Sequence, residues 1–235
     1  MGAMMASENE HQLGDFVKGR FLFIEETCKK GGRDLDEAVA EIKSECLRLA
    51  ASPERRQIIE KKLFSGAVLP SSTLPDWVDK VFLEAMSRVL SPPGASPITN
   101  SSRNPCLAFE SGRFNAKRQA ATVFRPFFAG KKPAQWVMKD FPIIYRQCYG
   151  PEVAKTLTVE EIGPGRCRVT MNNHGLEKAS VLDCSTAVGY LYGALEATGA
   201  KEPLVTHTTC GLIAGGRSGG PCVFELSWRE EGGAK

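Results

Sequence analysis

The fold is decided by CSTAVGYLYGALEATG at residues 184–199 and by CVFELSW at residues 222–228. The first stretch predicts a helix that Gly199 ends, because glycine readily takes the left-handed conformation of a helix cap. The second alternates apolar and polar residues as a strand does, and so do residues 204–213, with a glycine-rich turn at 214–220 between the two. The chain therefore closes on a helix and a β-hairpin.

The composition is that of an ordinary globular protein. The chain has 235 residues, of which 42% are hydrophobic and 24% charged, enough to bury a core without disulfide bonds. No stretch approaches the roughly 20 apolar residues that span a bilayer, and no secretory signal opens the chain. We therefore expect a cytoplasmic protein without a membrane span.

Apolar spacing divides the chain into a helical first part and a mixed second part. Residues 1–14 are polar and are expected to form a disordered tail. Residues 15–91 form a helical N-terminal region, in which Ser52 and Pro53 mark a helix start. Residues 92–105 form a proline-rich linker, and residues 106–230 form an α+β domain. The expected helices are 15–30, 34–51, 52–64, 76–90, 111–128, one starting at 132, and 185–198; the expected strands are 155–162, 167–171, 204–213 and 222–228. The predicted fold class is α+β, with helices on one face of an antiparallel sheet.

At the closing helix and hairpin the chain resembles a known group of domains. The run from Ala187 to Gly199, followed by a strand, a cysteine, glycines and Cys222-x-Phe-x-Leu-x-Trp228, is similar to the end of 4-vinyl-reductase-like domains. Haem-NO-binding-type sensor domains and a myxobacterial paralogous family end similarly, and all resemble the TRAPP subunit fold. The resemblance covers residues 110–230. It implies a small-molecule sensor or a dimeric interaction module of bacterial signalling, without chemistry of its own.

Because some of these relatives bind haem, the positions of the histidines decide whether haem is expected here. Haem-binding relatives need an axial histidine on a helix, whereas this chain has His11 in the expected tail, His174 in a turn and His207 in a strand. We therefore expect neither haem nor another cofactor.

A ligand pocket is predicted where aromatic residues gather. Apolar walls with a few hydroxyl groups are typical of small-molecule sites, and two arginines there could hold a carboxylate or phosphate. The alternative is that the rings are plain core. The predicted ligand-binding residues are Phe124, Arg125, Phe128, Trp136, Tyr145, Arg146, Tyr190 and Tyr192.

Two other features suggest partners. Gly189 and Gly193, four residues apart, allow another helix to approach closely, which fits a homodimer seam as well as internal packing. Residues 113–146 hold eight basic residues against the single acid Asp140, so they could meet an anion, an acidic partner or nucleic acid. A nucleic-acid-binding regulator that uses residues 113–146 is thus the alternative function, and steep salt dependence would reveal it.

The eight cysteines are scattered without a Cys-x-x-Cys pair, so we expect free thiols. His207, Cys210 and Cys222, with Cys184 nearby, are the right ligand types for zinc. However, the turn at 214–220 predicts a register that sets Cys210 opposite Phe224 and turns His207 to the other face of the sheet. We expect no metal site unless a bulge shifts this register.

Catalytic and phosphate sites are weaker hypotheses. His174, Asp183 and Cys184 are the only nucleophile-like set, and the glycine turns lack the helix N-terminus of phosphate-binding loops. The predicted function is therefore that of a non-enzymatic sensory or scaffold protein that binds a small apolar or anionic molecule or a protein partner. The resemblance implies that it is a homodimer.

Overall fold

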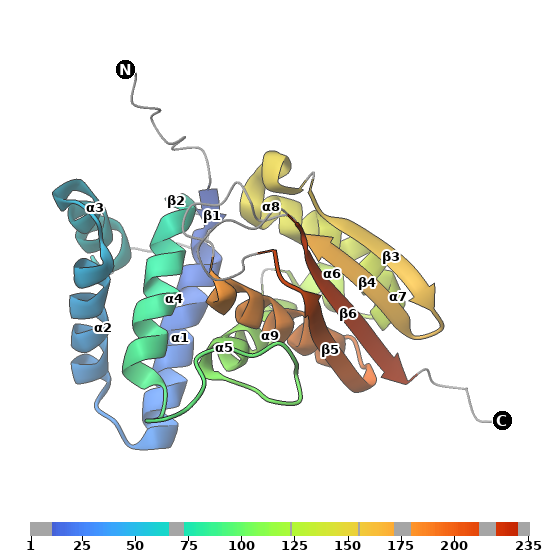
Figure 1. The fold of residues 1–235 in the computed structure, drawn as a ribbon, viewed down its shortest axis with the longest axis horizontal. Helices are drawn as coiled ribbons and strands as arrows, with labels where there is room; N and C mark the ends of the chain where they lie inside the picture. The colour runs from blue at the N-terminus through green and yellow to red at the C-terminus, as the bar shows by residue number, and fades with distance from the viewer. Residues whose placement is uncertain are drawn as a thin grey trace.

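The computed structural model describes residues 11–65, 73–122, 124–154, 156–171, 180–211 and 220–229. Its N-terminal helices are α1 (Gly14–Gly31), α2 (Leu35–Leu49), α3 (Pro53–Ile58) and α4 (Asp76–Leu90). The π-helical turn η1 (Ile59–Leu63) continues α3, and the short strands β1 (His11–Leu13) and β2 (Thr73–Pro75) pair antiparallel. These helices form one side of the molecule (Figure 1).

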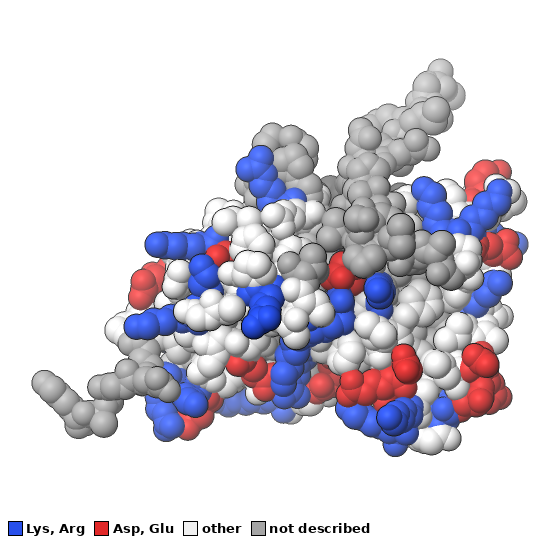
Figure 2. Space-filling view, turned by 180° about the vertical axis from the view of Figure 1, so that it is seen from behind, with Lys and Arg blue, Asp and Glu red and all other residues white. Residues whose placement is uncertain are grey.

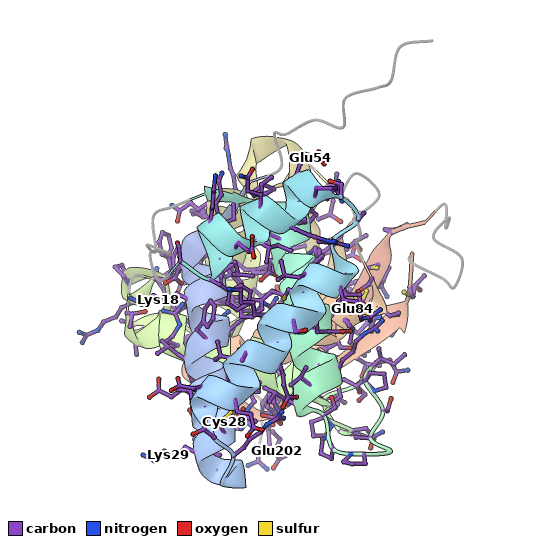
Figure 3. All side chains as sticks on the ribbon, turned by 90° about the vertical axis from the view of Figure 1, so that its left-hand side faces the viewer. Lys18, Cys28, Lys29, Glu54, Glu84 and Glu202 are labelled. Carbon is purple, nitrogen blue, oxygen red and sulfur yellow. The ribbon has the colours of Figure 1, made fainter. Side chains whose placement is uncertain are left out.

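Local sequence signals explain where these helices begin. The Ser52 hydroxyl accepts a hydrogen bond from the Arg55 amide at 3.3 Å, so serine caps α3 as predicted. Asp34 caps α2 in the same way, through the Glu37 amide at 2.8 Å. The outer faces are polar: Lys29 and Glu54 are exposed and extend from the helices into solvent (Figure 3).

The second part is built on a four-stranded antiparallel sheet with the order β3-β4-β6-β5. Its strands are β3 (Thr158–Gly163), β4 (Arg166–Met171), β5 (Lys201–Thr209) and β6 (Cys222–Arg229). Alternate residues of β6 are buried, including Phe224 and Leu226, so one face of the sheet meets the helices. The predicted α+β class is confirmed.

The helices that accompany the sheet include two whose backbones approach each other closely at glycine residues. They are α5 (Leu107–Ala121), α6 (Arg125–Phe128), α7 (Pro133–Gln135), the π-helical η2 (Trp136–Asp140), α8 (Phe141–Ala154) and α9 (Val181–Ala197). A Cβ atom added to Gly189 of α9 would lie 1.9 Å from the backbone oxygen of Phe109 in α5. One added to Gly193 would lie 2.6 Å from the Arg113 oxygen. These glycines therefore serve internal packing.

The proline-rich segment after α4 lies along the outer edge of β5. Ser101 forms an isolated antiparallel bridge with Thr206, and the His207 amide donates to the Asn100 oxygen at 2.7 Å. The segment predicted as a linker is thus an irregular loop that partly covers a strand edge. A single hydrophobic core cluster includes Phe82 of α4 as well as Phe224 of the sheet.

Some predicted boundaries were wrong. Helix α9 begins at Val181 rather than Ser185, because Ser180 and Asp183 form a capping box. Residues 181–182 are therefore helical. Strand β5 covers 201–209 instead of 204–213. The predicted turn that contains His174, and residues 214–219 of the predicted turn at 214–220, lie outside the described residues. Within the part of the chain that is described, no helix is long and apolar enough to cross a membrane.

Candidate functional site

A small cavity lies between the N-terminal helices and helices α8 and α9. Its volume is about 70 Å³. Phe16 of α1, Tyr145 and Tyr149 of α8 and Tyr190 of α9 are among the residues that line it. The rings contact one another: the centroids of Tyr145 and Tyr149 are 4.8 Å apart, and those of Phe16 and Tyr190 are 5.8 Å apart. Aromatic rings therefore supply five of the 15 lining residues.

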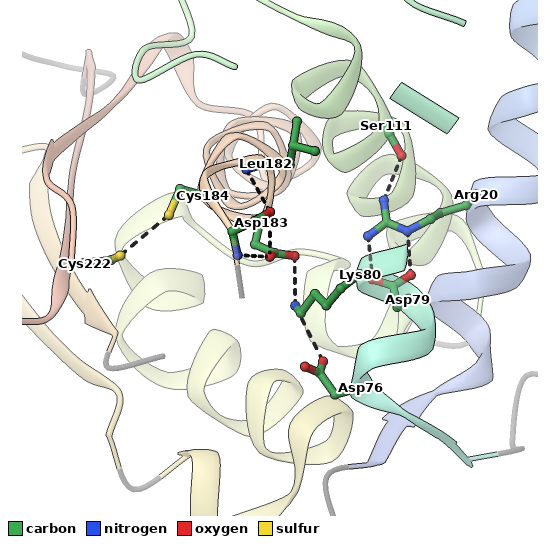
Figure 4. Close-up of polar contacts among 10 residues, drawn as sticks. Arg20, Asp76, Asp79, Lys80, Ser111, Leu182, Asp183, Cys184 and Cys222 are labelled. Carbon is green, nitrogen blue, oxygen red and sulfur yellow. Dashed lines mark hydrogen bonds and ion pairs between the residues drawn. The ribbon is translucent and has the colours of Figure 1, made fainter. Parts of the chain in front are cut away.

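Charged side chains complete the wall, and they are paired. Arg20 Nε donates to Asp79 Oδ1 at 2.6 Å, and Arg20 Nη2 donates to Asp79 Oδ2 at 2.7 Å. The guanidinium also donates to the Ser111 hydroxyl at 3.2 Å. This bidentate pair joins α1 to α4, and its Ser111 contact reaches α5 (Figure 4).

Lys80 of α4 forms a second ionic link. Its Nζ lies 2.9 Å from Asp183 Oδ1 and 3.5 Å from Asp76 Oδ1. Burial lowers the pKa of Lys80, but the charges of Asp183 and Asp76 outweigh burial and raise this pKa well above its ordinary value. Lys80 is therefore a charged ammonium at neutral pH.

Hydroxyl groups supply the other polar atoms of the cavity. Burial raises the pKa of Tyr145 and of Tyr149, so both phenols stay protonated. The Tyr190 hydroxyl donates to Gln119 Oε1 at 2.8 Å. The hydroxyl of Thr186, another lining residue, is buried and has no hydrogen-bond partner among the described residues. It is a free donor or acceptor for a bound molecule.

The structure divides the eight predicted ligand-binding residues. Tyr145 and Tyr190 line the cavity. The rings of Phe124, Phe128 and Trp136 are buried in the core, and Phe141 joins Trp136 to Tyr145 through ring contacts. The other three predicted residues do not line the cavity: Arg125 and Arg146 are exposed, and Tyr192 packs on Phe109 and beneath the Arg113 guanidinium.

Sequence reasoning missed the buried charges Arg20, Asp79 and Lys80, and it named Asp183 only in a nucleophile-like set and not as the partner of Lys80. A signal was present, because Asp79 and Lys80 interrupt an otherwise apolar helical face. The partners of Asp79 and Lys80 lie far away in the sequence, however, and one sequence alone does not show which charges form pairs.

A second site lies where α9 approaches the end of the sheet. Cys184, His207, Cys210 and Cys222 each offer a ligand atom, and these atoms all lie within 4.8 Å of one another. Cys184 Sγ and Cys222 Sγ are 3.6 Å apart. Three of the side chains are buried, Cys210 is partly exposed, and His207 Nε2 has no hydrogen-bond partner among the described residues. We call these four residues the Cys–His cluster.

The pairing register of β5 and β6 brings these four residues together. The predicted register, which set Cys210 opposite Phe224, was wrong. His207 lies opposite Phe224 and Thr209 opposite Val223, with an irregularity between His207 and Thr209. The shift places the end of β5, where Cys210 follows, beside Cys222. It also allows His207 and Cys210 to point to the same side, as a bulge does.

The cluster favours thiolate formation at one cysteine and has an access path. The hydrogen bond with Cys184 lowers the pKa of Cys222, and His207 and the Gly211 amide lower it further against the effect of burial. Cys184, His207 and Cys210 also line a surface groove of about 1030 Å³. Three sulfur ligands and one imidazole match the donors and number of a structural zinc site.

The basic segment is partly neutralised by ion pairs. Arg113 contacts Glu196 at 2.7 Å, Arg118 contacts Asp15 at 2.5 Å, and the Lys131 and Lys117 amines reach carboxylates at 3.5 and 3.6 Å. The view from behind shows basic and acidic side chains intermixed (Figure 2). Four of the eight basic residues are thus paired with carboxylates of the described part of the chain. The hypotheses of a nucleophilic set at His174 and of a phosphate site at the glycine-rich turn are not tested, because His174 and most of that turn lie outside the described residues.

Known proteins match this chain in fold only. No family model matches it, and no curated protein matches it. A point mutant of the T. Tengcongensis H-NOX is 12% identical with a TM-score of 0.54, and the match covers 92% of this chain and 97% of that chain. A structure described as probing the function of heme distortion in the H-NOX family is also 12% identical, with a TM-score of 0.54 and coverage of 91% and 95%.

A third structure, described as modulating heme redox potential through porphyrin distortion, is 11% identical with a TM-score of 0.52 and coverage of 92% and 93%. These matches support the haem-NO-binding branch of the expected resemblance as a fold. They do not support the 4-vinyl-reductase or TRAPP branches.

The described cavity does not fit a haem. Its volume of about 70 Å³ is far below the roughly 300–1,000 Å³ of pockets that hold drug-sized molecules. No histidine lines it among the described residues. A porphyrin would have to displace the aromatic rings and the two ionic links together.

Proposed function

We propose that this chain is a sensory domain that binds one small, mostly apolar molecule in the cavity between α1, α4, α8 and α9. The observation that carries this proposal is the cavity itself, which combines aromatic rings in mutual contact with the hydroxyl of Thr186, which is unpaired among the described residues. Packed interiors contain few voids larger than a water molecule. A void with this lining is therefore a reasonable ligand site.

The size and lining of the cavity restrict its ligand. An apolar cavity of about 150 Å³ is known to bind benzene, so 70 Å³ suits a molecule of that size or smaller with modest side-chain movement. The aromatic rings favour an apolar body, and Thr186 favours one hydrogen-bonding group. The charges of Lys80 and Arg20 are already balanced by carboxylates, which disfavours a strongly charged ligand.

The N-terminal helices would report ligand binding. Phe16 and Arg20 belong to α1, and Asp79 and Lys80 belong to α4, so four of the 15 lining residues come from these helices. A ligand that moves this wall moves α1 and α4 relative to the sheet. This arrangement supports a sensor more than an enzyme.

A cavity-filling variant tests the proposal with benzene as the probe. Ala187 lines the cavity, so Ala187→Leu should fill it, whereas Ala197→Leu places the same side chain on an exposed position of the same helix. At ten times its dissociation constant, a ligand stabilises the folded state by about 1.4 kcal/mol. That corresponds to about 3–6 °C in melting temperature.

We expect benzene to raise the melting temperature of the natural chain and of the control variant Ala197→Leu. It should not raise the melting temperature of Ala187→Leu. No benzene-dependent shift in the natural chain, or an equal shift in all three proteins, would reject the cavity as the binding site.

We also propose that the Cys–His cluster binds one zinc ion, and the convergence of four ligand atoms supports this second site. A closed set of four protein ligands is typical of structural zinc, so the metal would fasten α9 to β5 and β6. Elemental analysis should find one zinc per chain. Cys222→Ser should lose it, whereas Cys28→Ser, a buried cysteine of α1, should retain it. Equal zinc contents in both variants would contradict the site.

The homodimer, the cytoplasmic location and the alternative of nucleic-acid binding stay predictions. Size-exclusion chromatography with light scattering measures the first directly. The internal packing of Gly189 and Gly193 against α5 removes one reason for expecting a dimer.

A further inference from the structure

The two proposed sites lie on different sides of the same helical turn, the first turn of α9. Asp183, Thr186 and Ala187 of α9 line the cavity, whereas Cys184, the residue after Asp183, belongs to the Cys–His cluster. Successive residues of an α-helix point about 100° apart because there are 3.6 residues per turn. The first turn of α9 therefore has one side in each site.

This turn is held firmly on the cavity side. Asp183 Oδ2 accepts a hydrogen bond from the Ser180 amide at 2.7 Å, and Asp183 Oδ1 lies 2.9 Å from Lys80 Nζ. The same carboxylate thus caps α9 and binds it to α4 (Figure 4). Any displacement of the turn must move this ion pair or break it.

The turn is also connected to the loop before α5. The Thr99 amide donates to the Ser185 hydroxyl at 2.9 Å, and that hydroxyl donates to the Thr99 oxygen at 3.1 Å. The neighbouring Asn100 oxygen accepts from the His207 amide at 2.7 Å. Ser185, which follows Cys184, and His207, which belongs to the Cys–His cluster, therefore hold this loop at two points.

We infer that occupancy of the Cys–His cluster and the conformation of the cavity are thermodynamically coupled through the first turn of α9 and the Asp183–Lys80 ion pair. The inference rests on the zinc site proposed above. Ligand atoms must lie about 2.0–2.3 Å from zinc, so binding fixes Cys184 relative to β5 and β6. Because Asp183 is adjacent on the same turn, its ion pair with Lys80 is fixed as well. Coupling of this kind is reciprocal, and it typically changes affinity about 5- to 150-fold.

The tyrosines provide a direct measurement. The chain has only four, of which Tyr145, Tyr149 and Tyr190 line the cavity. Tyr192 contacts Phe109 instead and is an internal control. Fluorotyrosine-labelled full-length protein should therefore give four fluorine NMR signals, which can be followed while zinc is added to the metal-free protein. A chromogenic chelator measures zinc binding in the same samples.

We expect zinc to shift the three cavity signals and to leave the Tyr192 signal in place. In Asp183→Asn, the amide oxygen can still cap α9 but the charge that holds Lys80 is lost, so zinc should bind while the cavity signals stay where they were. The Tyr192 signal and circular dichroism report whether this variant is folded. If it is not, Lys80→Gln provides the same test from the other partner.

The outcomes separate the two proposals. If zinc binds the natural chain but the cavity tyrosine signals do not move, the coupling is overturned and the zinc site stands. The same holds if zinc moves these signals equally in the natural chain and in Asp183→Asn. If the chelator shows that no zinc binds, the zinc site is overturned together with the coupling. A shift confined to Tyr192 also contradicts the coupling.

Discussion

The buried Arg20–Asp79 pair yields a prediction whose size follows from its surroundings. The two side chains are 3% and 1% exposed, and their closest atoms lie 2.6 Å apart. Arg20→Met keeps the apolar stem but leaves the Asp79 carboxylate buried without its bidentate partner. Removing one member of a buried pair costs about 3–5 kcal/mol. For a chain of this length that corresponds to about 6–20 °C in melting temperature.

A double-variant cycle separates the pair from the loss of packing. Replacing both charges, as in Arg20→Met with Asp79→Leu, should recover most of the stability, since apolar replacement of a whole buried pair is often neutral or better. Arg48→Met is the matched control, because Arg48 also forms two hydrogen bonds with one carboxylate, that of Glu45, but is 59% exposed. It should change stability little. The assay is urea unfolding followed by circular dichroism.

The reasoning would be refuted if Arg20→Met unfolded at the same urea concentration as the natural chain. It would also be refuted if the double variant were less stable than Arg20→Met, because the carboxylate would then not be the source of the loss.

Three further predictions concern packing, pH and salt. Gly189→Ala should destabilise the fold by at least about 2 kcal/mol, because its Cβ would lie 1.9 Å from the Phe109 oxygen; Gly31→Ala, which meets nothing within 4 Å, should not, and equal melting temperatures would contradict the close packing. Burial raises the pKa of Cys46 from 9.0 to about 12, so the unfolded chain loses this proton first, and stability should fall between about pH 9 and 12 by up to about 1.4 kcal/mol per unit. Cys46→Ala should show a shallower decline in urea unfolding, and an unchanged slope would show that this thiol does not ionise differently on unfolding. Finally, fluorescence anisotropy should detect little binding of a random DNA duplex at physiological salt; tight binding that weakens steeply as salt rises would favour residues 113–146 as a nucleic-acid site.

Local signals predicted much of the fold. The helix expected at 76–90 matches α4, because its apolar residues recur at helical spacing, and Ser52 with Pro53 located the start of α3. The strands of the closing hairpin were recognised from alternation: β6 ends one residue later than predicted, whereas the bounds of β5 moved by three and four residues.

The sites were harder to predict because they depend on long-range geometry. A shift of the β5–β6 register and one irregularity decide whether His207 faces Cys222 or turns away, and neither follows from residue types. Similarly, Arg20 and Asp79 are 59 positions apart in the sequence, so only the packing of α1 on α4 brings them together. Periodicity identifies faces of helices and strands, but it does not identify their partners.

The loop along β5 has a consequence for any attempt to shorten the protein. An uncovered strand edge is a template for pairing with another chain, and Ser101 and Asn100 occupy part of this one. A fragment that starts after the loop would lose this cover as well as the aromatic and charged wall from α1 and α4. We expect such a fragment to aggregate more readily than the whole chain, because the uncovered edge of β5 can pair with another copy.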